Sequence, residues 1–114
     1  MAKKTLIAPV LGALAAIAAV SAANAGPAVA TRWQKASIPQ EDCLRRAEGA
    51  IAAAGFGRLE RTEQSRYGTR DDYTAAVRCV TENGIVFIIV SGPSRQIADG
   101  LSGTVFQHYS GENK

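Results

Sequence analysis

Apolar residues recur at two different spacings after residue 36, and these spacings predict two helices and three strands. In residues 37–54, and again from residue 94 onward, apolar side chains repeat every three or four positions, as on one face of a helix. Residues 73–81 and 85–90 instead show alternating or continuous apolar positions of strand length. Residues 58–66 are a polar stretch with weak alternation, which is typical of an edge strand. Short links favour an antiparallel three-stranded meander with both helices on one face. The expected fold is a small two-layer α+β domain in the order α-β-β-β-α.

The first predicted helix carries signals at both of its ends. Ser37 is expected to act as its N-cap, with Pro39 in the first turn. Gly55 is expected to end it, and Phe56 to fold back onto it as in a Schellman motif. The pattern therefore predicts a helix that begins and ends within residues 37–55.

Asn83 and Gly84 predict a tight hairpin, because both positions of a type I′ turn need positive φ. A two-residue loop places Cys79 opposite Ile88, and opposed residues share a face of the sheet. One set of side chains then faces the helices with Cys79, namely Val86, Ile88 and Val90. The other set has no predicted element to cover it and consists of Ile85, Phe87 and Ile89, beside Val80. An uncovered apolar cluster of this kind is typical of an interaction surface.

Two alternatives compete with an exposed apolar face. The segment that contains Trp33 can fold over this face and cover it. A three-residue hairpin loop can also exchange the two faces of residues 85–90, because a register shift of one residue turns every side chain over. Even then one apolar set points away from the helices.

Cys43 and Cys79 are the only cysteines, and we expect them to form a disulfide. The bond closes a loop of about 37 residues, worth about 4 kcal/mol in the chain-entropy model. A metal pair, a redox pair and two free thiols are the alternatives. The chain has no Cys-x-x-Cys motif and His108 is its sole histidine, so we expect neither a metal nor a cofactor.

The N-terminus resembles a bacterial Sec-type signal peptide. Lys3 and Lys4 precede an uncharged apolar run at residues 6–20, and small residues follow at Ala23 and Ala25. We expect cleavage after Ala25; the alternative is an uncleaved anchor, although the run is short for a span. The remaining chain divides into a flexible lead-in (residues 26–36), one disulfide-linked domain (37–110) and a tail (111–114). This organisation predicts a periplasmic or secreted protein without a membrane segment after cleavage.

The net charge of +3 belongs mostly to this leader. Residues 1–25 carry Lys3, Lys4 and no acid, so their removal lowers the formal charge to +1. Five arginines do cluster in the middle of the chain, but four acids are interleaved with them: Arg58, Arg61, Arg66, Arg70 and Arg78, with Glu60, Glu63, Asp71 and Asp72. This pattern favours a solvated, ion-paired strand edge over an anion-binding surface. Stacking aromatic residues are few, so nucleic acid is not an expected partner.

The candidate chemistry is sparse. Free N–H groups where the last strand meets the last helix form a possible anion site, with Ser91, Gly92, Ser94 and Arg95. No nucleophile motif surrounds any serine, so we expect no enzyme and no catalytic residues. The sequence predicts an exported binding domain that contacts a second copy or a periplasmic protein through Ile85, Phe87, Ile89, Val80 and Trp33. The alternative is an anion- or small-ligand-binding module that uses the last helix and the arginine-rich strands.

Overall fold

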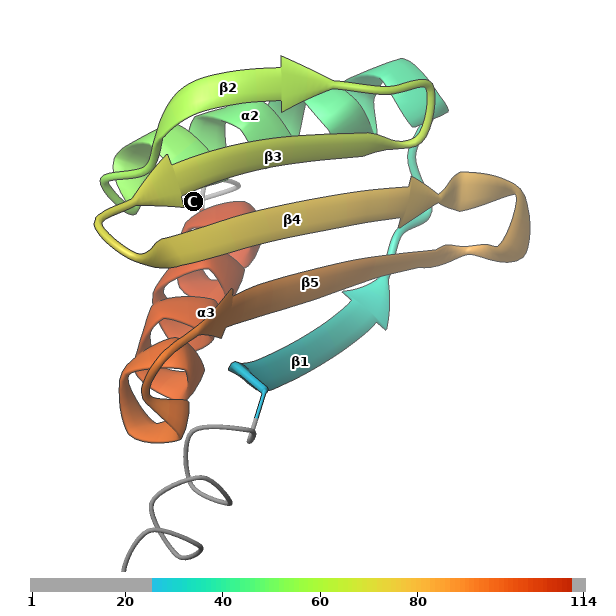
Figure 1. Ribbon diagram of the computed structural model, residues 1–114. Coiled ribbons are helices and arrows are strands. Elements are labelled where there is room, and N and C mark those ends of the chain that lie inside the picture. The colour runs from blue at the N-terminus through green and yellow to red at the C-terminus, as the bar shows by residue number, and fades with distance from the viewer. Residues whose placement is uncertain (1–25, 112–114) are drawn as a thin grey trace, which may run out of the picture.

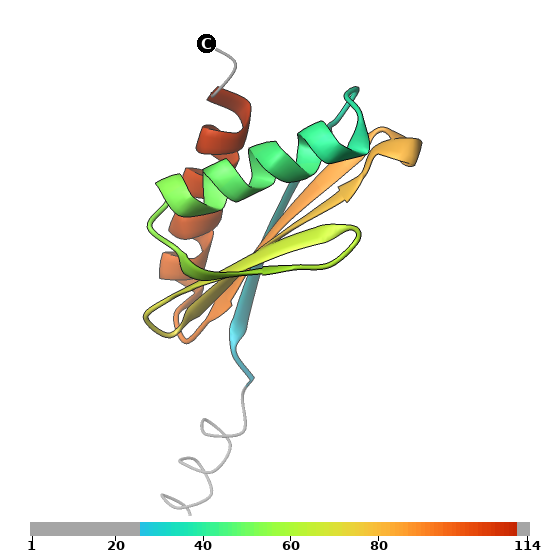
Figure 2. The same ribbon diagram turned by 90° about the horizontal axis from the view of Figure 1, so that it is seen from above.

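The strands pair in the order β1-β5-β4-β3-β2, and every neighbouring pair is antiparallel. The computed structural model describes residues 26–111. Figure 1 shows the sheet with both helices behind it, and Figure 2 confirms that the helices share one face. The elements in chain order are β1 (Ala28–Lys35), α2 (Gln40–Ala53), β2 (Gly57–Arg61), β3 (Ser65–Arg70), β4 (Tyr73–Val80), η1 (Thr81–Asn83), β5 (Ile85–Gly92) and α3 (Arg95–Gly111).

The sheet has five strands, so the predicted three-stranded meander is wrong in number although the α+β class is confirmed. Residues 28–35, expected to be a lead-in, form β1 at one edge of the sheet. Residues 58–66, expected to be one strand, divide between β2 and β3. Thr62 makes this division, because its Oγ1 accepts hydrogen bonds from the backbone N–H groups of Gln64 (3.3 Å) and Ser65 (3.0 Å) and so holds a turn.

Helix α2 ends as predicted but begins two residues later. Pro39, and not Ser37, stands at the N-cap, and no side chain caps the helix there. At the other end Gly55 adopts a φ of 88°. The Phe56 N–H donates to the Ile51 carbonyl (3.1 Å) and the Gly55 N–H donates to the Ala52 carbonyl (2.9 Å), which is the Schellman pattern. Phe56 is buried and packs into the core.

The β4–β5 hairpin differs from the predicted one in its turn and register. Its loop is the 3₁₀ turn η1 followed by Gly84 at a φ of 70°, and Asn83 has no positive φ. Val80 therefore pairs with Ile85, and Cys79 pairs with Val86 instead of Ile88. This shift of two residues preserves the face of every side chain, because side chains alternate with a period of two.

The core lies between the sheet and the two helices. Val86, Ile88 and Val90 are fully buried there, as predicted, together with Val77 and Ile51. The Cys43–Cys79 disulfide is present and joins α2 to β4, with its Cα atoms 6.1 Å apart. The predicted signal peptide lies outside the described residues. Within residues 26–111 no helix combines the length and apolar character that a membrane span needs.

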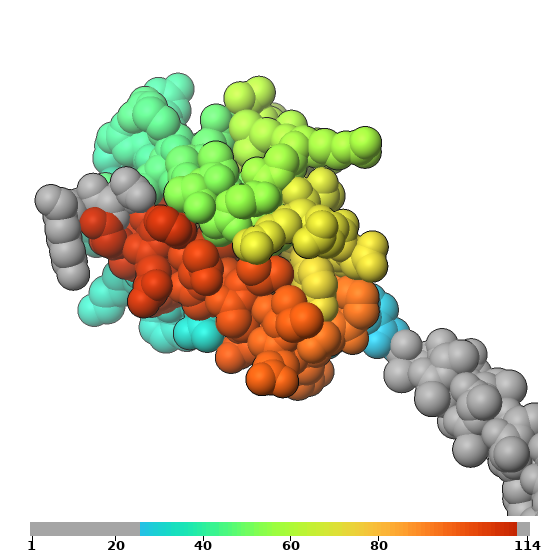
Figure 3. All heavy atoms as spheres, turned by 90° about the vertical axis from the view of Figure 1, so that its left-hand side faces the viewer, coloured from blue at the N-terminus to red at the C-terminus, as the bar shows by residue number. Residues whose placement is uncertain are grey.

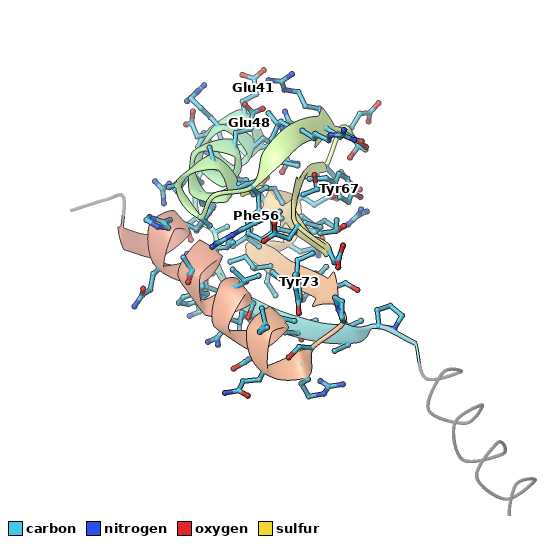
Figure 4. All side chains as sticks on the ribbon, turned by 60° about the vertical axis from the view of Figure 1, so that its left-hand side comes forward. Glu41, Glu48, Phe56, Tyr67 and Tyr73 are labelled. Atoms are coloured by element: carbon cyan, nitrogen blue, oxygen red, sulfur yellow. A yellow bond between two sulfur atoms is a disulfide. The ribbon has the colours of Figure 1, made fainter. Side chains whose placement is uncertain are left out.

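Two glycines on the inner face of the sheet allow other groups to approach the backbone closely. A Cβ at Gly68 of β3 would lie 2.6 Å from Ile51 Cγ2 of α2 and 2.9 Å from Phe56 Cβ. A Cβ at Gly92 of β5 would lie 2.1 Å from the Tyr73 ring. Figure 4 shows Phe56 and Tyr73 between the sheet and the helices. Helix α2 thus packs over a part of β3 that has no room for a side chain, and the Tyr73 ring fills the corresponding space over β5.

Candidate functional site

The face of the sheet that points away from the helices carries three of the exposed large apolar side chains of the described residues. The apolar cluster around them lies over β1, β5 and the end of β4, and we call it the outer patch. Trp33 is 61% exposed, Val29 is 47% exposed and Phe87 is 37% exposed, whereas the inner residues of β5 are fully buried. The members of the outer patch are Val29, Trp33, Val80, Ile85, Phe87 and Ile89. No described element covers it (Figures 1 and 2).

Trp33 and Phe87 form the centre of the outer patch. They are direct partners across β1 and β5. The Ala36 N–H donates to the Gly84 carbonyl at 3.0 Å, and these two residues lie opposite each other in the same register. Hydrogen-bonded and non-hydrogen-bonded pairs alternate along an antiparallel ladder, so Trp33 and Phe87, three positions away, form a non-hydrogen-bonded pair. Side chains approach most closely in such pairs. Trp33 therefore extends the apolar face beside Phe87 and does not fold over it.

The same face turns polar toward its other edge. A shallow depression of about 300 Å³ lies over β2, β3 and the start of β4. Its lining includes Arg58, Glu60, Tyr67, Thr69 and Thr74. Figure 4 shows Tyr67 on the side of the sheet opposite the helices. The outer face thus has an apolar half and a polar half that meet over β4.

At the start of α3, groups of the chain itself occupy the predicted anion site. Ser94 caps the helix, since its Oγ accepts the Ile97 N–H at 3.3 Å. The Ser94 N–H donates to the Tyr73 hydroxyl at 3.0 Å, and the Tyr73 ring lies against Gly92. Arg95 donates to the Val29 carbonyl at 3.3 Å. Ser91 lies on the opposite face, beside Thr74. Figure 3 views this end of the molecule, where the β3–β4 turn (yellow) lies beside the start of α3 (orange).

The arginine cluster is bound to neighbouring groups of the α2 side of the fold. Glu48 of α2 accepts hydrogen bonds from Arg61 (2.9 Å) and Arg66 (2.6 Å). Arg70 donates to the Ala54 carbonyl at 2.9 Å, and Arg78 donates to the side chain of Gln64. Arg61 and Arg66 therefore tie β2 and β3 to α2 through Glu48, which is not one of the interleaved acids that the sequence suggested as partners.

Glu48 has an altered acidity because of these arginines. The hydrogen bond from Arg61 lowers the pKa of Glu48 from its usual value of 4.5, and Arg66 adds to this effect, while partial burial opposes it. The carboxylate lies beside a groove of about 570 Å³ between α2 and the β2–β3 turn (Figure 4). Glu48 serves here as a structural anion for two cations.

The remaining candidate groups are dispersed. Both cysteines are in the disulfide, and His108 lies in the last turn of α3. Among residues 26–111, no three side chains of the metal-ligating types gather closely enough to hold an ion. Burial raises the pKa of the Tyr109 hydroxyl, which donates to Cys43 Sγ at 3.2 Å inside the core.

Sequence reasoning missed Val29 and Thr31 as members of the outer face and Glu48 as the partner of the arginines. A signal for the first two was present, since Val29, Thr31 and Trp33 alternate with smaller or polar residues at strand spacing. Glu48 had no comparable signal, because its partners lie on β2 and β3, at least 13 residues further along the chain.

The chain has no significant match among protein-family models, curated proteins or solved structures.

Proposed function

We propose that this protein is a non-enzymatic binding domain that docks another protein on its outer patch. The observation that carries this proposal is the Trp33–Phe87 pair, a tryptophan and a phenylalanine held side by side on an uncovered sheet face. Tryptophan is enriched among the residues that dominate binding energy at protein interfaces. A rigid sheet presents both rings with little loss of conformational entropy on binding.

The composition around the two rings fits a protein partner. Ile85, Ile89 and Val80 surround them and are only half-buried, so a partner would remove further apolar surface from water. Arg78 lies directly opposite Phe87 on β4, and Lys35 lies opposite Ile85 on β1, so charged side chains border the apolar ones on the same face. An apolar centre with a charged margin is the usual organisation of a protein–protein interface.

We further propose that the domain acts after export, in the periplasm or outside the cell. The disulfide supports this compartment, because such bonds persist in oxidising surroundings. The sequence at residues 1–25 supports it independently through its signal-peptide pattern. Isolation of the chain from a periplasmic extract with Gly26 as its first residue is the expected result, and retention of residues 1–25 in the cytoplasm would contradict it.

Photocrosslinking tests the docking surface. We expect p-benzoylphenylalanine at position 87 of the exported chain to form an ultraviolet-dependent adduct with one protein. The same probe at Gln107, an exposed position on α3, serves as the matched control and should form no such adduct. An adduct of twice the chain's mass would identify a second copy as the partner. Equal adducts at both positions, or none at position 87, would contradict the proposal.

A further inference from the structure

Strand β1 presents an open row of backbone groups at the edge of the sheet. In an antiparallel ladder, residues bond alternately to one side and to the other. The bond from the Ala36 N–H to the Gly84 carbonyl shows that the backbone groups of the even-numbered residues of β1 point toward β5. The N–H and C=O groups of Val29, Thr31, Trp33 and Lys35 therefore point away from the sheet. The Arg95 guanidinium bonds to the Val29 carbonyl from outside the ladder, which agrees with this assignment.

The β1 edge has few of the features that prevent strand addition. It is eight residues long, and its register with β5 runs from Ala28 to Lys35 without a bulge. It contains no proline and no acidic residue. Edges of this kind accept another strand unless something covers them. In Figure 1 no described element lies beyond β1.

We propose that β1 pairs with β1 of a second copy of this chain, antiparallel and centred on Thr31, to form one continuous sheet across two copies. The argument for a second copy is the self-complementarity of the strand. Around a two-fold axis at Thr31, Val29 lies opposite the second copy's Trp33 on the outer face. These are the two most exposed apolar side chains of β1. Thr31 then lies opposite its own equivalent, a favourable pair in sheets.

Charge disfavours the neighbouring register that has its two-fold axis at Arg32. A two-fold axis at Arg32 would place two arginines directly opposite each other, and like charges in that position are destabilising. With the axis at Thr31, Arg32 instead lies opposite the second copy's Ala30 on the inner face. Arg32 keeps its bonds to Ser102 (2.9 Å) and Asp99 (3.3 Å) on α3 of its own copy.

Pro27 gives the paired ladder a natural end. In this register Lys35 lies opposite the second copy's Pro27, which has no N–H to donate. The hydrogen-bonded pairs are therefore Val29 with Trp33, Thr31 with Thr31, and Trp33 with Val29. The Val29 carbonyl can accept a second bond beside that from Arg95, because a carbonyl oxygen has two lone pairs. The pairing places the outer patches of the two copies side by side on one face of the joined sheet. It does not depend on whether another protein binds to the outer patch.

Proline at position 31 tests the pairing. The Thr31 N–H has no role in the β1–β5 ladder, so Thr31→Pro should leave the fold intact while it blocks the centre of the new ladder. In sedimentation equilibrium we expect the wild-type exported chain and the matched control Thr31→Ala to be dimers. Thr31→Pro should raise the dimer dissociation constant about a hundredfold or more. Phe87→Glu should remain dimeric, because Phe87 lies one strand away from the edge.

A cysteine at position 31 tests the register and does not depend on the proline variant. Hydrogen-bonded pairs place Cα atoms about 5.5 Å apart, within the range of a disulfide. Thr31→Cys should therefore form a covalent dimer on a non-reducing gel. Lys35→Cys is the matched control, exposed on the same strand and face but opposite Pro27, and should not. A monomeric wild type, a dimeric Thr31→Pro, or crosslinking of Lys35→Cys without Thr31→Cys would overturn the proposal. Dissociation by Phe87→Glu alone would instead assign the dimer to the outer patch.

Discussion

The two edge strands of the sheet, β1 and β2, differ in length, charge and regularity. The α2 half (α2, β2 and β3) ends in β2, a strand of five residues with three charged side chains and a shift in register between Gly57 and Glu60. The α3 half (α3, β1 and β5) ends in β1, which is longer, regular and carries Trp33. Short length, charge and bulges are the devices that keep edges from pairing. The form of β2 therefore disfavours strand addition, whereas β1 has the length and regularity that the proposed pairing requires.

The two halves also differ in the chemistry of their surfaces, although the α3 half has an ion pair of its own between Arg32 and Asp99. Glu48 gathers Arg61 and Arg66 on the α2 half, whereas the outer patch on the α3 half consists of apolar side chains. A near-neutral charge for residues 26–114 conceals this segregation. Net charge therefore does not show where the apolar and ion-paired surfaces of this domain lie, whereas the residues of each strand do.

The largest expected effect comes from the disulfide, which joins α2 to the central strand β4 and has no counterpart on α3. Replacement of Cys43 and Cys79 by alanine should lower the free energy of unfolding by about 4 kcal/mol. Urea unfolding measures this loss. The rate of amide hydrogen exchange should then rise more in α2 than in α3. An equal rise in both helices would show that the two halves depend equally on the disulfide.

Gly68→Ala should lower the free energy of unfolding by about 1–3 kcal/mol, because the new methyl group would overlap Ile51 and Phe56 beneath α2. Thermal unfolding of the variant checks this loss. A change within error would mean that α2 can move away from β3 without penalty, and that the close packing of the α2 half is not required.

On the exposed surfaces of the helices, replacement of glycine by alanine should raise the free energy of unfolding instead of lowering it. A Cβ at Gly49 of α2, or at Gly100 of α3, would meet no atom within 4 Å. Each substitution should raise the free energy of unfolding by about 1 kcal/mol, since alanine loses less backbone entropy in a helix. Equal gains in urea unfolding would show that the halves differ at their edges and not in their helices.

The smallest effect should come from Glu48→Gln, at about 0.5 kcal/mol at pH 7, because the ion pairs are partly exposed. The pKa of Glu48 is lowered in the folded chain, so the folded state binds its proton less readily than the unfolded state. The stabilisation is complete above the usual pKa of 4.5 and is lost as the pH falls through the lowered value. Urea titrations at pH 7 and pH 3 should show a larger difference between variant and wild type at the higher pH.

Local patterns were sufficient for the two helices and for the faces of β4 and β5. The spacing of apolar residues predicted both helices, and Gly55 followed by Phe56 predicted the Schellman end of α2. The count of two cysteines predicted their disulfide. The assignment of Val86, Ile88 and Val90 to the core survived a wrong hairpin turn. The error in register was two residues, and a strand repeats its faces every two residues.

Long-range pairing accounts for what the sequence left open. Residues 28–35 join β5, 50 to 64 positions away, and no local signal records that distance. The split at Thr62 depended on hydrogen bonds from its side chain, which a weak alternation of apolar residues does not predict. Periodicity along a chain reports which side chains share a face, because that follows from backbone geometry alone. The neighbour of each strand, and hence the edge that stays open, follows from packing between segments that are distant in sequence.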